Sequence, residues 1–194
     1  MIRDAPEGVG SVVSNFDMDT DETLSLYAAG YDAENHYIGD YVAVWTLTGN
    51  LDQPGLEDSI FVFSPSTAPT SGSIIATVGN FSDATGTISV DPGALASLEI
   101  RTAPNNGGDL VTTISMTVDE SYTFWAAGFD SEDNYIQDET VVWSSPPFGI
   151  IDQPGQSLSF QPTVPNSGTL TATSGSFFYT TGTIDVNVGS LHHI

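Results

Sequence analysis

The sequence predicts an all-β protein made of two tandem β-sandwich domains, and two observations carry this prediction. The nineteen residues from Tyr27 to Trp45 return as a similar stretch from Trp125 to Trp143, at a constant offset of 98 residues. Short runs of alternating apolar and polar residues are separated by Gly, Pro, Asn and Asp, which is typical of half-buried strands and their turns. A fixed offset over this length indicates two copies of one structural unit.

Each copy contains a strand, a polar turn and a second strand that leads to a Trp. In the first copy Leu24, Leu26 and Ala28 alternate before the turn, and Trp45 lies in the run after it. This arrangement resembles the B–C hairpin of immunoglobulin-like sandwiches, whose Trp fills the core. Trp45 and Trp143 are therefore the expected core residues. Since the chain has no Cys, packing alone must hold each sandwich.

The repeat divides the chain of 194 residues into an immunoglobulin-like domain 1 over residues 1–93 and a domain 2 over residues 94–194. About seven short strands are expected in each copy. Beyond the hairpin they are predicted at 60–63, 74–78 and 86–90, with counterparts at 158–160, 170–173 and 182–188. The very short junction at Pro92-Gly93 predicts two sandwiches arranged end to end as a semi-rigid rod.

The composition excludes several classes of partner. The chain has 25 acidic residues, two arginines and no lysine, which gives a formal net charge of −23. Nucleic acids and anionic membrane surfaces bind clustered Lys and Arg, so neither is an expected partner. No apolar stretch approaches the eighteen residues of a membrane span, so membrane insertion is not expected. The hydrophobic content of 39% argues against disorder.

Both copies resemble the bacterial immunoglobulin-like (Big) repeats of invasin- and intimin-like adhesins and other long surface proteins. The resemblance rests on segments 28–45 and 126–143 with their hairpin Asp and Asn, and on the Gly-Thr-Ile triplets at 86–88 and 182–184. Such repeats serve mainly as stalks. The resemblance therefore implies a structural stalk or fibre module of a repetitive extracellular or cell-surface protein, such as an adhesin-like spacer or a filament unit.

The two hairpins concentrate oxygen ligands, and Ca²⁺, which takes six to eight oxygens from flexible loops, is the one candidate cofactor. The spacing only partly matches a calcium loop, because Tyr135 stands where an EF-hand would need Gly. The favoured interpretation is that Asp and Asn form the turn and cap its backbone. The candidate metal ligands are Asp32, Glu34, Asn35, Asp40, Asp130, Glu132, Asn134 and Asp138.

An alternative function is a carbohydrate- or receptor-binding immunoglobulin-like module, possible with or without calcium. Aromatic residues flank both hairpins, and Trp125 and Tyr135 are the candidate ligand-binding residues. Cross-strand aromatic pairs are, however, ordinary stabilisers of β-sheets. The structural interpretation is therefore preferred.

No set of residues predicts an enzyme, because no Ser-His-Asp or Cys-His combination recurs in the two copies. His36 is replaced by Asn134 in the second copy, which argues against a metal or catalytic role for His36. Arg3 and Arg101 occupy equivalent positions, and a repeated ion pair is predicted there. Asn80 begins a glycosylation sequon, Asn-Phe-Ser.

The boundaries between the copies of the repeat are expected to fall within a first strand and not between two domains. Residues 189–194 match residues 93–98 at an offset of 96, so they begin the first strand of a further repeat, while domain 1 has a first strand truncated at its N-terminus. Either the chain is an excerpt of a longer array, with neighbouring repeats as partners, or copies associate head to tail through residues 189–194. The excerpt is favoured because His192-His193 provides little apolar anchoring.

Overall fold

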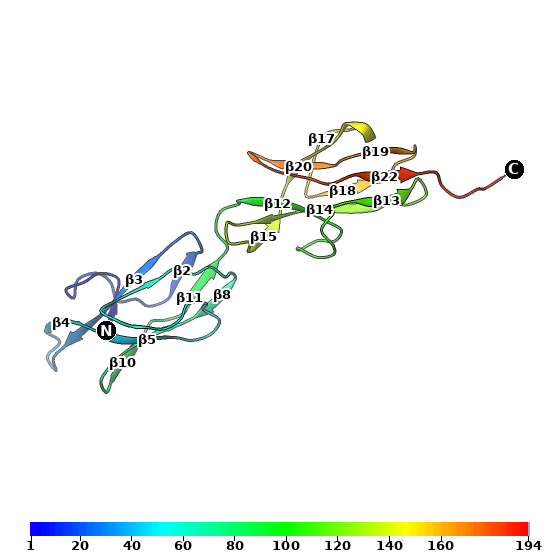
Figure 1. Cartoon of the computed structure of the whole chain (residues 1–194). Coiled ribbons are helices and arrows are strands. Elements are labelled where there is room, and N and C mark those ends of the chain that lie inside the picture. Colours follow the sequence, from blue (N-terminus) through cyan, green and yellow to red (C-terminus); the bar gives the residue numbers. More distant parts are fainter. Residues whose placement is uncertain (194) are drawn as a thin grey trace. The chain divides into compact units, whose positions relative to one another are not determined.

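The computed structural model describes residues 1–193, and the chain divides into two compact units, Met1–Gly93 (unit 1) and Ala94–Ile194 (unit 2). Among the described residues, the regular secondary structure consists of β-strands apart from one short 3-10 helix, Pro146–Phe148, in unit 2 (Figure 1). The predicted all-β class is thereby confirmed. Within residues 1–193, no helix is long and apolar enough to cross a membrane.

The first sheet of unit 1 is centred on the longest strand of the unit, β3. β7 pairs with the first half of β3 and β4 with its second half, both antiparallel, while β1 pairs across the middle of β3. Tyr27 pairs with both β1 and β7, and Ala28 pairs with both β1 and β4. β1 therefore lies along one edge of β3, and β4 and β7 lie along the other. The strands of this sheet are β1 (Ile2–Arg3), β3 (Leu24–Tyr31), β4 (Tyr37–Tyr41) and β7 (Ile60–Phe63).

The second layer of unit 1 is built around one long hairpin that is interrupted in the middle. Its inner half pairs β9 with β10, and its outer half pairs β8 with β11. β5 pairs with β9 and, along its other edge, with β6. β2 runs parallel to β11 at the opposite edge of the layer. The strands are β2 (Phe16–Asp19), β5 (Ala43–Leu47), β6 (Glu57–Asp58), β8 (Thr70–Gly72), β9 (Ile74–Val78), β10 (Phe81–Ala84) and β11 (Ile88–Asp91).

The period-two pattern explains which side chains fill the space between the layers. In β3 Leu24 and Leu26 face the core, and in β5 Trp45 is completely buried while its neighbour Val44 is 45% exposed. Trp45 stacks on Phe61 with ring centroids 5.5 Å apart, and its indole Nε1–H donates to the carbonyl of Asp58 at 3.0 Å. The indole is thus packed on its face and hydrogen-bonded at its edge, as a buried Trp requires.

Unit 2 repeats this topology strand for strand, and Trp143 is as fully buried as Trp45. Two strands differ most in length: β12 has five residues where its counterpart β1 has two, and β17 has six where its counterpart β6 has two. The strands are β12 (Ser97–Arg101), β13 (Ile114–Thr117), β14 (Tyr122–Phe129), β15 (Tyr135–Asp138), β16 (Val141–Ser145), β17 (Ile150–Gly155), β18 (Ser157–Phe160), β19 (Asn166–Gly168), β20 (Thr171–Ser174), β21 (Phe177–Thr180) and β22 (Ile184–Asn187).

The predicted number of strands was too low, because several continuous segments change partner along their length. The segment after the hairpin turn pairs first with β3, as β4, and then crosses to the other layer as β5. β10 and β21 were not predicted, since β10 is exposed along its whole length and so lacks an apolar alternation. The last strands are also shorter than expected: β11 begins at Ile88 and β22 ends at Asn187.

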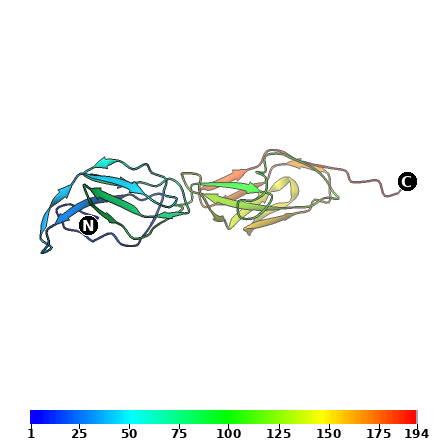
Figure 2. The ribbon, with the colours of Figure 1, turned by 90° about the horizontal axis from the view of Figure 1, so that it is seen from below.

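The chain continues beyond β22 as an extended segment without assigned secondary structure. In both views of the ribbon this segment leads away from the strands of unit 2 (Figures 1 and 2). Its apolar side chains are exposed, with Val188 at 74% and Leu191 at 82%.

Candidate functional site

Asp32 organises the hairpin turn between β3 and β4. Its Oδ1 accepts hydrogen bonds from the backbone N–H groups of Glu34, at 3.0 Å, and His36, at 2.7 Å, and its Oδ2 lies 3.0 Å from Nδ1 of the His36 ring. The bond from the His36 backbone N–H is the main reason why the pKa of Asp32 is lowered. Asn35 completes the turn with φ of 65°, a left-handed conformation that Asn tolerates.

Asp130 does the same in unit 2, where it is buried. Its Oδ1 accepts the backbone N–H groups of Glu132, at 3.1 Å, and Asn134, at 2.7 Å, and Nδ2 of Asn134 donates to Oδ2 at 2.9 Å. His36 and Asn134 therefore contact the carboxylate of the first Asp in equivalent ways. Comparison of residue types alone missed this equivalence, because an imidazole and an amide share only their ability to donate a hydrogen bond.

Asp40 and Asp138 lie away from the turn carboxylates and hold a different loop. Oδ2 of Asp40 accepts the backbone N–H of Glu7 at 2.7 Å, and Oδ2 of Asp138 accepts that of Asn105 at 2.9 Å. The other oxygen of Asp138 accepts a hydrogen bond from the Tyr135 hydroxyl at 3.0 Å. Burial, reinforced by this carboxylate, raises the pKa of Tyr135 to about 12. These acids tie the loop after the first strand to the hairpin.

The hairpin of unit 1 also brings together a small group of metal-binding atoms. One ligand atom from each of Asp32, Glu34 and His36 lies within 4.8 Å of the others, and all three residues are exposed. Calcium requires six to eight oxygens, whereas this group offers two carboxylates, one already bonded to backbone N–H groups, and an imidazole. The residues fit a capped turn and not a calcium cage. Calcium binding stays a prediction, which melting curves in EDTA and in millimolar Ca²⁺ can check.

The aromatic residues beside the hairpins form one edge-to-face pair in each unit. The ring centroids of Tyr31 and Tyr37 are 5.9 Å apart, and those of Phe129 and Tyr135 are 6.0 Å apart, both at 66°. Trp125 lies half-buried on β14, four residues before Phe129, which corresponds to about 13 Å along a strand. The candidate ligand-binding residues Trp125 and Tyr135 therefore do not share one flat platform.

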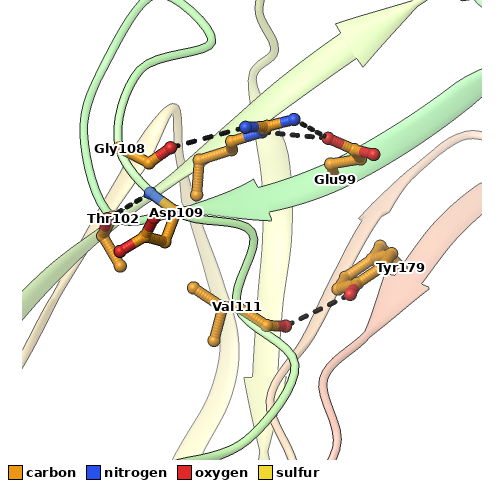
Figure 3. Close-up of polar contacts among 7 residues, drawn as sticks. Glu99, Thr102, Gly108, Asp109, Val111 and Tyr179 are labelled. Atoms are coloured by element: carbon orange, nitrogen blue, oxygen red, sulfur yellow. Dashed lines mark hydrogen bonds and ion pairs between the residues drawn. The ribbon is translucent and has the colours of Figure 1, made fainter.

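The predicted ion pair is present in unit 2, but the prediction is wrong for unit 1. In unit 2, Arg101 donates through Nε and a terminal nitrogen to the same oxygen of Glu99, at 2.9 and 2.6 Å, and also reaches the carbonyl of Gly108 (Figure 3). In unit 1 the position of Glu99 is taken by Met1. Arg3 instead donates to the Tyr31 hydroxyl and to the carbonyl of Gly10, both at 2.6 Å.

Both arginines thus serve to hold the loop that follows the first strand. The same loop is fastened in unit 2 by the Asp109 backbone N–H, which donates to the hydroxyl of Thr102 at 2.9 Å, and the Tyr179 hydroxyl donates to the carbonyl of Val111 just after it at 3.1 Å (Figure 3). Among the described residues, the charged side chains of the hairpins and of Arg3 and Arg101 mostly form hydrogen bonds or ion pairs within their own unit.

Unit 1 contains an open groove of about 760 Å³ between the second half of β3 and the β9–β10 hairpin. Its lining includes Ala29, Gly30 and Tyr31 on one side and Val78, Phe81 and Asp83 on the other. In unit 2 the corresponding position is covered by the first half of β12, where Leu98 is buried, and by Leu95 just before this strand, which packs against the core. The groove was not predicted from the sequence and is a finding of the structure.

No family model matches this chain, and no curated protein matches it in sequence. Among solved structures it is similar to the N-terminal four Ig domains of Dscam1 isoform 6.9, with a TM-score of 0.37 and 8% identity over 92% of this chain. The chain spans 44% of the length of that structure. It is also similar to the Ig1-2 module of the Drosophila receptor protein tyrosine phosphatase DLAR, with a TM-score of 0.25 and 14% identity, covering 93% of this chain and 97% of that one.

Both of these structures consist of immunoglobulin domains, but their overall similarity to this chain is low. The fold class rests on the structure of the chain itself. In each unit a sheet centred on β3 or β14 packs against a second layer, with a buried Trp between them. At the edge of the second layer, β2 runs parallel to the last strand β11, and β13 runs parallel to β22 in the same way. Each unit is therefore an immunoglobulin-like β-sandwich.

Proposed function

We propose that this chain is a structural spacer, a stalk or fibre module of a repetitive extracellular or cell-surface protein. The observation that supports this most is a parallel pair that the second strand and the last strand form in each unit. β2 near the start of unit 1 runs parallel to β11 at its end, and β13 runs parallel to β22 in unit 2. A spacer must resist tension between its ends, and this pair lies between them.

The direction of the pair determines how it carries a load. Tension applied to the two ends of a unit pulls parallel neighbours in opposite directions along their axes. All the hydrogen bonds between them are then loaded together instead of opening one after another. The Phe16 N–H donates to the carbonyl of Thr87 at 3.0 Å, and the Thr20 N–H donates to that of Asp91 at 3.2 Å. In unit 2 the Ile114 N–H donates to Thr183 at 3.1 Å.

The composition is compatible with exposure outside the cell. The net charge of −23 favours solubility, and a fold without Cys does not depend on the redox state of its surroundings. At the hairpins, Asp32, Asp40 and Asp130 accept hydrogen bonds from backbone N–H groups of their own unit. A spacer function therefore requires no ligand at these acids.

Single-molecule pulling on the whole chain tests the proposal. We expect two unfolding events, each releasing roughly 30 nm of chain for about a hundred residues at ~3.3 Å. Phe16→Pro removes one N–H from the parallel pair and should lower the unfolding force of unit 1. Phe16→Ala removes the side chain but keeps this N–H, so it serves as the matched control. Extension without force peaks, or equal forces for the two variants, would contradict a load-bearing role.

A further inference from the structure

We infer that Asn80 is an N-glycosylation site, whose side-chain amide accepts an oligosaccharide from a polyprenyl-pyrophosphate donor. This site depends on the extracellular location in the proposed function, because N-linked sugars are attached to surface loops of secreted proteins. Three features of the chain support it: the sequon Asn80-Phe81-Ser82, the turn in which the sequon begins, and the equivalent turn of unit 2.

The sequon begins at the tip of the hairpin that joins β9 to β10. Phe81 pairs with Val78, so the turn between the two strands consists of Gly79 and Asn80 alone. Both turn residues are exposed, and a Cβ atom built on Gly79 would meet no other atom within 4 Å. The turn projects from the unit (Figure 1), and a bulky group attached to Asn80 therefore has room.

The equivalent turn of unit 2 has the same surroundings. Phe177 pairs with Ser174 across Gly175 and Ser176, which are both exposed. A Cβ atom built on Gly175 would also meet no atom within 4 Å. The two turns are alike although β12 is longer than β1, so their exposure does not depend on the length of the first strand.

The turn does not need an asparagine at this position. Gly79 adopts the left-handed conformation, with φ of 59°, and Asn80 does not. Among the described residues the Asn80 side chain has no hydrogen-bond partner, and Ser176 takes its place in unit 2. Most other asparagines of the chain contribute to the fold through a side-chain hydrogen bond or a left-handed backbone: Asn15, Asn35, Asn105, Asn106, Asn134, Asn166 and Asn187.

The hydroxyl that the sequon requires is accessible as well. Ser82 lies on β10 opposite Thr77, and the next pair along the hairpin joins Asp83 to Ala76, which is buried in the core. Successive residues of a strand face opposite sides of the sheet, so Ser82 lies on the outer face. It is exposed, and its counterpart Phe178 is 68% exposed in unit 2.

The modification is a group transfer from a lipid-linked sugar donor to Asn80. The amide Nδ2 forms a bond to the anomeric carbon of the first sugar. The bond between this carbon and the pyrophosphate oxygen of the donor breaks, and the polyprenyl pyrophosphate leaves with the electron pair. The amide proton passes to a base of the transferring enzyme, and no atom is oxidised or reduced.

The attached sugar would lie at the end of an edge strand. β10 is at the edge of its sheet, as β21 is in unit 2. Edge strands present backbone groups to which another chain can add. A bulky, solubilising sugar on the turn before β10 hinders such an approach to unit 1, which suits a protein that must remain unaggregated outside the cell.

Cell-free translation with endoplasmic-reticulum microsomes tests the site on the whole chain, which a cleavable signal peptide delivers into the lumen. Only chains protected from added protease are scored, so a failure of delivery is not counted as a failure of modification. The wild-type chain should migrate more slowly by one glycan, and peptide-N-glycosidase should remove this shift. Asn80→Gln and Ser82→Ala should abolish the shift, whereas Ser82→Thr keeps the hydroxyl and should retain it.

A second measurement asks whether the folded unit accommodates the sugar. Asn80→Ser copies the residue of unit 2 and is the matched unglycosylated control. The glycosylated chain, secreted from cultured eukaryotic cells, should have the circular dichroism spectrum and the urea midpoint of this control, because the turn projects away from the unit.

A protected wild-type chain without the shift would overturn the inference. So would a shift that persists in Asn80→Gln, or a glycosylated chain that is less stable than Asn80→Ser. The pulling experiment is done on the chain without sugar, so its result bears on the spacer function and not on this site.

Discussion

At the scale of single residues, chemically identical acids have distinct structural tasks. Asp32 and Asp130 cap the hairpin turns, whereas Asp40 and Asp138 hold the loop after the first strand. Spacing along the sequence placed Asp32 with Asp40, and Asp130 with Asp138, in one candidate site on each hairpin. In the structure they are separate, because each carboxylate accepts hydrogen bonds from backbone N–H groups near it. Residues in the left-handed backbone conformation, such as Asn35, leave these N–H groups without a backbone partner.

The capping role of Asp32 predicts a dependence of stability on pH. Hydrogen bonds hold its folded pKa below the ordinary value of 3.8. The stabilisation is therefore complete at pH values above the unfolded pKa and is lost as the pH falls through the lower folded pKa. Asp32→Asn should lower the urea midpoint at pH 7, and its difference from the wild type should shrink towards pH ~2. A difference that is constant with pH would contradict this role.

The exposed Glu34 provides the matched control for that titration. Its carboxylate belongs to the same turn, but Glu34 contributes to the cap through its backbone N–H, which donates to Asp32. Glu34→Gln removes one charge from the same place and should leave the urea midpoint and its pH dependence close to those of the wild type.

At the scale of secondary-structure elements, a buried threonine joins the two halves of the long hairpin in each unit. The Thr85 hydroxyl accepts the backbone N–H of Ile74 at 2.9 Å and donates to the carbonyl of Gly86 at 2.8 Å. Thr181 makes the same pair of bonds with Leu170 and Gly182. The side chain replaces a backbone partner where the strand shifts from one pairing to the next. This device allows one segment to serve as both β10 and β11.

Replacing Thr85 with Val tests this device, because Val has the same shape but no hydroxyl. The Ile74 N–H would remain buried without a partner, which costs about 1–3 kcal/mol. Thr181→Val should have the same effect in unit 2. Denaturant unfolding measures the loss. Thr87→Val is the control, since Thr87 is exposed two residues further along the same connection between β10 and β11, and it should change stability little. Equal effects at Thr85 and Thr87 would contradict the assignment.

At the scale of the whole molecule, the chain has two separate cores of similar composition but different aromatic packing. In unit 1, Trp45 stacks on Phe61. In unit 2, Phe160 contacts both Phe124 and Phe148, with the Phe148 ring edge-to-face at 5.0 Å. Phe148 belongs to the short helix that follows β16, so the longer loop of the second copy contributes to its core.

Two separate cores predict that damage to one leaves the other intact. Trp45→Ala should destabilise unit 1 by about 3–5 kcal/mol through the cavity it leaves. Hydrogen exchange should then show faster opening of amides in β5 and β9, with unchanged protection in β16 and β20. Val44→Ala, at a 45% exposed position of the same strand, is the control and should cost far less. Equal loss of protection in both units would show that the cores are coupled.

The sequence by itself determined the two sandwiches, the hairpins and the buried Trp positions, because an internal period and a two-residue alternation are properties of neighbouring residues. Only the tertiary structure decided which strands change layers, that β10 exists, that His36 and Asn134 act alike, and that the ion pair of Arg101 has no counterpart at Arg3. It also revealed the groove beside β3. Backbone pairing joins residues far apart in the chain and is largely independent of side-chain type, so no local pattern records it.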